Sequence, residues 1–178
     1  METLLKKHSE VQAELERIEF HDREAKALVE KIMADGVVED KELRQLGDAQ
    51  LKLQLTEPRK KKCASLLAQL EKEIQVALRV AASAWNRRVK AARVAMEDRI
   101  VAVNLPFFDG NEKRARRWLI REGYGPPFDA LQRIGRCAWS GAEAVPTPGD
   151  NAFWAGRAKL FLEHVKKCEK VFAELGCQ

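Results

Sequence analysis

Residues 58–103 read PRKKKCASLLAQLEKEIQVALRVAASAWNRRVKAARVAMEDRIVAV, and this stretch decides the fold. Pro58 opens it, and neither proline nor glycine follows before its end. Nothing in the rest of the stretch therefore interrupts a helix. Its apolar side chains recur every eleven residues in three rows: Leu67, Leu78, Val89 and Ile100; Leu70, Ala81, Ala92 and Val103; and Ile74, Trp85 and Met96.

The eleven-residue repeat sets the geometry of this helix. Eleven residues make three turns at about 3.67 residues per turn, which is close to a relaxed α-helix, so the apolar stripe runs nearly straight or winds slightly right-handed. About 46 residues at roughly 1.5 Å each give a helix of about 69 Å. That length exceeds the diameter of a small domain. We therefore expect other helices, or a second copy of the chain, to cover the stripe.

A heptad pattern precedes the long helix. Apolar residues stand at every seventh position of a helix predicted over about residues 3–34, and a companion row three residues earlier is interrupted by His8 and Asp22. Heptads favour left-handed pairing with another helix. The principal row consists of Leu4, Val11, Ile18, Ala25 and Ile32.

Two breaks are predicted before the long helix begins. Asp35-Gly36 ends the first helix, and Asp40 caps a short second helix that reaches about Leu55. Thr56-Glu57-Pro58 then predicts the start of the long helix, because threonine caps free backbone amides and proline is tolerated in a first turn.

The composition changes after residue 105. Three of the four tryptophans, the single tyrosine and five of the six prolines lie there, and helices are predicted over about 112–122, 128–139 and 150–175. The last carries an apolar stripe at helical spacing. We predict an all-α fold: an N-terminal antiparallel helical bundle or coiled coil around one long central helix (1–104), and a small aromatic-rich helical subdomain (105–178). The stripe consists of Trp154, Phe161, Val165, Cys168, Phe172 and Leu175.

Charge and cysteine usage bound the cellular setting. Residues 1–57 carry a net charge of −5 and residues 58–178 a net charge of +10, so the two regions either attract each other or leave a basic body for an anionic partner. No apolar run approaches the roughly 20 residues of a membrane span. Residues 1–7 are already charged and do not form the apolar block of a secretory signal, so we expect no export, and the four cysteines are widely spaced. We expect a cytoplasmic protein without membrane contact.

Metal and catalytic motifs are weak. With Gly36 at the sixth position of a calcium loop, Lys31 and Met33 occupy the first and third positions, where carboxylates are required. His164 and Cys168 stand four residues apart and Cys177 follows, but no paired set completes four zinc ligands. We predict a capped turn and buried thiols, with no metal, cofactor or catalytic residue, and a protein that is not an enzyme.

Basic clusters carry the functional prediction. They have three interpretations: solvated helix faces, contacts with an acidic protein surface or with the acidic N-terminal helices, or phosphate contacts with nucleic acid. The clusters are Arg59-Lys60-Lys61-Lys62; Arg87, Arg88, Lys90 and Arg93; and Lys113, Arg114, Arg116, Arg117 and Arg121.

The leading hypothesis is a non-catalytic helical protein–protein interaction protein, of adaptor, assembly or regulatory kind, with self-association as one option. The alternative is a subunit that binds nucleic acid, or another polyanion, without sequence specificity through the basic clusters. The partner-binding residues predicted from the sequence are Trp85, Arg88, Met96, Arg114, Arg117, Arg121, Tyr124 and Phe128.

Overall fold

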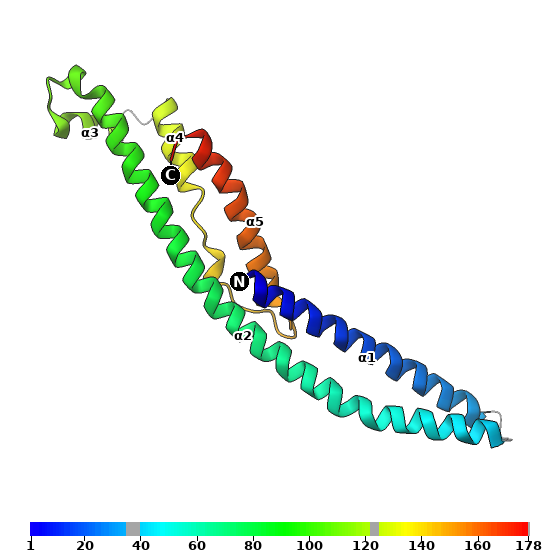
Figure 1. Cartoon of the computed structure of the whole chain (residues 1–178). Coiled ribbons are helices and arrows are strands. Elements are labelled where there is room, and N and C mark those ends of the chain that lie inside the picture. The colour runs from blue at the N-terminus through cyan, green and yellow to red at the C-terminus, as the bar shows by residue number, and fades with distance from the viewer. Residues whose placement is uncertain (35–39, 122–124, 178) are drawn as a thin grey trace. The chain divides into compact units, whose positions relative to one another are not determined.

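The computed structural model describes residues 1–34, 40–121 and 125–177, and within these ranges the chain forms helices and turns without any strand. This confirms the all-α prediction. None of the described helices is long and apolar enough to cross a membrane. The helices are α1 (Glu2–Ala34), α2 (Asp40–Asn104), α3 (Glu112–Arg121), α4 (Pro126–Gly135) and α5 (Phe153–Glu174), with 3-10 turns η1 (Leu105–Phe108) and η2 (Gly141–Glu143) (Figure 1).

Helix α2 is continuous from Asp40 to Asn104, so the predicted break at Thr56-Glu57-Pro58 is wrong. The Thr56 hydroxyl does not cap a new helix, because its Oγ1 lies 2.8 Å from the carbonyl oxygen of Leu53 and 3.1 Å from that of Lys52. It therefore bonds back into the preceding turn. Pro58 lies inside the helix and lacks an N–H, which removes one backbone hydrogen bond.

The chain forms two compact units. Unit 1 contains Met1–Ile74 and Thr147–Ala155, whereas unit 2 contains Gln75–Pro146 and Gly156–Gln178. Helices α2 and α5 each contribute residues to both units. The units divide the chain at other positions than the predicted regions 1–104 and 105–178, and that division stays a prediction.

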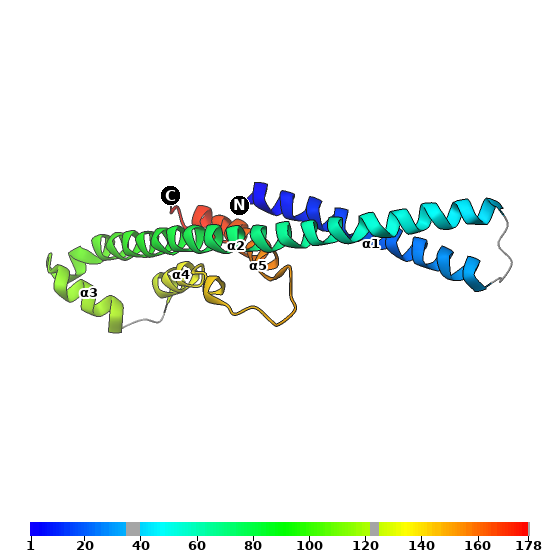
Figure 2. The same ribbon diagram turned by 90° about the horizontal axis from the view of Figure 1, so that it is seen from below.

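In unit 1, α1 runs antiparallel to the first part of α2 (Figures 1 and 2). The direction follows from the contacts, because His8 lies against Glu71 while Asp22 lies against Lys60. The later heptad residues Ile18, Ala25 and Ile32 are buried, as the pattern predicted. His8 and Asp22 are buried in the companion row, so the polar interruptions of the heptad lie inside the interface between the helices.

In unit 2, α5 and the segment that follows α4 cover the eleven-residue stripe at Trp85. Trp85 is buried and stacks on Phe172 of α5 at a ring-centroid distance of 5.4 Å. Of the predicted α5 stripe, Trp154, Phe161, Cys168 and Phe172 are buried, whereas Val165 and Leu175 are half-buried. The stripe loses its cover toward the end of α2, where Val103 is 69% exposed.

Candidate functional site

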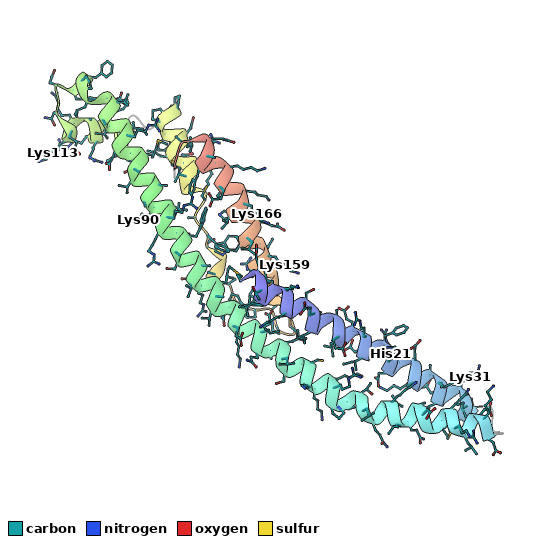
Figure 3. The ribbon with its side chains drawn as sticks, viewed as in Figure 1. His21, Lys31, Lys90, Lys113, Lys159 and Lys166 are labelled. Atoms are coloured by element: carbon teal, nitrogen blue, oxygen red, sulfur yellow. The ribbon has the colours of Figure 1, made fainter. Side chains whose placement is uncertain are left out.

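A groove of about 550 Å³ lies between α1 and α2 in unit 1. Ala25 and Ala49 form its floor. Both are buried, and their small side chains leave space between the two helices. His21 of α1 lies on its wall (Figure 3). The lining residues are His21, Glu24, Ala25, Leu28, Gln45, Asp48, Ala49, Lys52, Leu55, Thr56 and Arg59.

Large apolar side chains remain exposed along this groove. Leu28 is 38% exposed and Leu55 is 58% exposed, although both line it. They fall outside the buried heptad and eleven-residue rows, so the pairing of α1 with α2 does not cover them. Further exposed apolar residues of unit 1 are Phe20, Met33, Leu43, Leu51 and Leu66.

Asp22 is the first of two buried polar contacts that hold unit 1 together. Its Oδ2 lies 2.5 Å from Lys60 Nζ and 3.0 Å from Lys26 Nζ, and its Oδ1 lies 3.4 Å from Thr56 Oγ1. The hydrogen bond from Lys60, followed by that from Lys26, lowers the pKa of Asp22 below its ordinary value. Asp22 in turn raises the pKa of Lys60.

The basic cluster at 59–62 is thus partly neutralised within the chain. Lys60 pairs with Asp22, and Arg59 Nη2 lies 2.7 Å from Glu14 Oε1. For these two residues, the interpretation that the acidic N-terminal helix attracts the cluster is confirmed.

Glu71 forms the second buried contact and joins three segments. Its carboxylate accepts the backbone N–H groups of Trp154 at 2.7 Å and Ala155 at 3.0 Å, at the start of α5. His8 Nε2 lies 3.2 Å from the Glu71 Oε1. First-turn amides of a helix have no partner within that helix. Glu71 therefore takes the place of an N-cap side chain, from a position 83 residues away in the sequence.

Two of the predicted partner-binding residues lie in the core of unit 2 or against it. The Trp85 Nε1–H donates to the Cys137 carbonyl oxygen at 2.6 Å, so this ring is satisfied internally. The Arg88 guanidinium lies 5.4 Å from the Trp85 ring centroid and forms an ion pair with Glu169, which raises the pKa of Arg88. Met96 is half-buried.

The remaining predicted residues lie on or near α3 and α4. Arg114, Arg117 and Arg121 are exposed on α3, and Phe128 is half-buried in the first turn of α4. Tyr124 and the turn at 35–39 with its calcium-loop positions lie outside the described residues. Of the eight predicted residues, only Trp85 and Arg88 contact each other within the described part of the chain.

His164 contacts two of the cysteines of unit 2, one through its backbone carbonyl and one through its thiol. Its Nε2 lies 2.8 Å from the Cys137 carbonyl oxygen and 3.5 Å from Cys168 Sγ. Burial, and then a hydrogen bond with the Cys137 thiol, raise the pKa of Cys168 to about 12. Within the ranges that the structure describes, no group of three or more His, Cys, Asp or Glu side chains is arranged to hold a metal ion. The Cys168 thiol is a poor nucleophile, because the thiolate is the reactive form.

Comparisons with protein-family models, curated proteins and solved structures found no match for this chain.

The groove between α1 and α2 was missed by sequence reasoning. Its signal was present in the leucines of residues 43–55, which do not share one helical phase. A pair of helices with more apolar positions than one interface can bury leaves a second apolar face.

Proposed function

We propose that this chain is a non-catalytic helical interaction protein, of adaptor, assembly or regulatory kind, that holds an amphipathic helix of a protein partner in the groove between α1 and α2. One observation carries the proposal: the groove has an alanine floor and exposed leucines on its walls. An amphipathic helix laid into an apolar groove is a recurrent mode of recognition.

The groove chemistry describes the partner helix. Leu28 and Leu55 would contact apolar residues spaced three and four apart, and each fully buried leucine contributes about 1.5–3 kcal/mol. Asp48 and Lys52 lie on the α2 wall one helical turn apart, so a helix with charges of both signs beside its apolar stripe matches this wall. A second copy of the chain is one such partner, because α1 itself has this pattern.

The proposal places the protein in the cytoplasm. Cys63, Cys137, Cys168 and Cys177 are all free thiols. Free thiols are typical of a reducing compartment. Labelling of all four cysteines in rapidly lysed, denatured native cells would support this setting, whereas a disulfide would contradict it.

Photocrosslinking tests the proposal. A photoreactive amino acid at Leu28 in the groove is expected to give discrete protein adducts in the native cell. The matched control carries the same group at Leu160, which is exposed on α5 and does not line the groove. Equal adducts from both positions, or none from Leu28, would contradict the proposal. Light scattering of the purified chain shows whether the partner is a second copy.

A second candidate function, binding of nucleic acid without sequence specificity, is favoured by α3. Arg114, Arg117 and Arg121 are exposed at spacings of three and four, and the described residues offer their side chains no ion pair. Phosphate contacts of this kind weaken steeply as salt rises. Changing the three arginines to glutamate is expected to abolish binding of a DNA duplex at low salt. Unchanged binding would dismiss α3 as the nucleic-acid site.

A further inference from the structure

Unit 2 contains a cleft of about 860 Å³ that the proposed function does not use. Its size lies within the range of small-molecule sites, about 300–1,000 Å³. One wall is a face of α2, and the other is the segment that leads from Trp139 into η2. The lining residues are Arg79, Ala82, Ser83, Asn86, Arg87, Lys90, Trp139, Ser140, Ala142 and Glu143.

Specific contacts fix the position of the second wall of the cleft. Asn86 binds the backbone of Trp139 twice, since its Nδ2 donates to the Trp139 carbonyl oxygen at 3.0 Å and its Oδ1 accepts the Trp139 N–H at 2.8 Å. Gly141 lies directly against the Trp139 ring, where a Cβ would come within 2.7 Å of a ring carbon. The buried residues Ala82 and Ala142 are small and leave space between the walls. Asn86 therefore fixes the second wall to the helix that carries the cations.

Three cations of the cleft have no counter-ion among the residues that the structure describes. Arg79, Arg87 and Lys90 form no side-chain hydrogen bond or ion pair within the described part of the chain. Neighbouring cations of unit 2 differ, because Arg88 pairs with Glu169 and Arg93 lies 3.2 Å from Glu97. Lys90 projects from α2 in Figure 3.

The spacing of these cations defines the ligand. Arg87 and Lys90 stand three residues apart on one helix face, so one compact anionic group can contact both. Arg79 lies eight residues before Arg87, about 12 Å along the axis. Arginine and lysine together suit phosphate, since arginine offers a planar fork of donors and lysine a point charge. Ser83 and Ser140 add hydroxyl groups, and Glu143 is the one acidic residue of the lining.

We propose that this cleft binds a small ligand that carries two or more linked phosphate groups. Arg87 and Lys90 contact one phosphate and Arg79 contacts the far end. The limited volume of the cleft and its second wall favour a discrete small molecule over a long polymer. This site is separate from the groove of unit 1, and it stands or falls independently of the proposed function.

Calorimetric titration of the full chain with inorganic tripolyphosphate tests the site at low salt. The double variant Arg87→Gln/Lys90→Gln is expected to bind at least about tenfold more weakly, because it loses charge-assisted contacts. The matched control Arg114→Gln/Arg117→Gln removes the same charge from exposed positions on α3 and is expected to retain affinity within about twofold. Circular dichroism checks that each variant stays helical.

Two further variants separate a built cleft from general charge attraction. Ser83→Trp fills the cleft without changing the charge and is expected to weaken binding about tenfold or more. Glu143→Gln removes the acidic residue of the lining and is expected to tighten binding severalfold. Both changes are at exposed positions, so both variants are expected to fold.

Three results would overturn the site. One is the absence of tripolyphosphate binding to the unmodified chain. Another is an equal loss of affinity in the cleft variant and the α3 control, since that identifies net charge as the cause. The third is binding of single-stranded DNA that depends on Arg87 and Lys90, together with no binding of tripolyphosphate. That result would assign these cations to a nucleic-acid backbone.

Discussion

The two units of this chain join their helices by different means. Unit 2 packs large rings: Trp85 stacks on Phe172, and Trp139 lies edge-on to Phe161 at a centroid distance of 5.6 Å. Unit 1 joins α1 to α2 through aliphatic side chains such as Ile18 and Ile32, through the small residues Ala25 and Ala49, and through two buried polar contacts centred on Asp22 and Glu71. Aromatic side chains bury the most area per residue and close the space between helices. Small residues with polar contacts fix the register of a helix pair while leaving an apolar face uncovered.

The largest effect is expected from Trp85→Ala in unit 2. This change removes the ring that stacks on Phe172 and the donor to the Cys137 carbonyl oxygen. We expect the free energy of unfolding to fall by about 3–5 kcal/mol, as large-to-alanine changes in cores do. Urea unfolding followed by circular dichroism measures it. Trp85→Phe keeps an aromatic ring and should lose less; an equal loss would show that packing on Phe172 contributes little.

A smaller but substantial effect is expected from Glu71→Ala in unit 1. The change leaves the Trp154 and Ala155 N–H groups without their acceptor, and each unsatisfied buried donor costs about 1–3 kcal/mol. We expect a loss of about 3 kcal/mol in urea unfolding. Glu73→Ala, at an exposed position of the same helix, should stay within about 0.5 kcal/mol. An equal loss in the free energy of unfolding for both variants would contradict the capping role of Glu71.

The Asp22 contact predicts the response of unit 1 to acid. Because the folded-state pKa of Asp22 is lowered, its contribution to stability is present above its unfolded pKa, near 3.8, and is lost as the pH falls through the folded value. Asp22→Asn should lower the urea midpoint at pH 7 by less than Glu71→Ala does, and should flatten the decline in stability below pH 4. Glu30→Gln, at an exposed position of α1, serves as the control. An unchanged acid limb in Asp22→Asn would contradict the ion pair.

The smallest effect concerns the thiols of unit 2 at alkaline pH. The folded-state pKa of Cys168 is raised from 9.0 to about 12, so its protonated form favours folding, and this contribution declines as the pH rises from about 9 toward 12. Cys168→Ala should flatten that alkaline decline. Iodoacetamide at pH 8 should alkylate the half-buried Cys177 before Cys168, as peptide mass spectrometry can follow. Faster modification of Cys168 would show that its thiol is accessible.

The sequence predicted the buried face of a helix correctly where a single apolar repeat determined that face. The eleven-residue row of Leu67, Leu78, Val89 and Ile100 is buried throughout, because a helix face with a regular apolar stripe must be covered. The break at Thr56 was predicted wrongly, since a threonine hydroxyl can bond forward as a cap or backward into its own helix, and here it bonds backward to the Leu53 carbonyl oxygen.

The candidate sites were harder to predict, because they depend on contacts between distant residues. Trp85 was assigned to a partner and is internal, since α5 supplies Phe172 to cover it. Arg79 belonged to no basic cluster, and its place in the cleft follows from Asn86 holding Trp139 against α2. Spacing along one helix shows which residues share a face, but not which of those faces a distant segment covers.

We propose that the exposed leucines of unit 1 serve a partner rather than the fold. The most direct test introduces Leu55→Lys into the protein that carries the photocrosslinker at Leu28, and the control introduces Leu160→Lys into the same protein. The free energy of unfolding and the crosslinked adducts are measured for both variants. We predict that Leu55→Lys changes the free energy of unfolding by no more than about 0.5 kcal/mol, and that it abolishes the adducts that the control retains. A large loss of stability, or adducts that persist in Leu55→Lys, would contradict the claim.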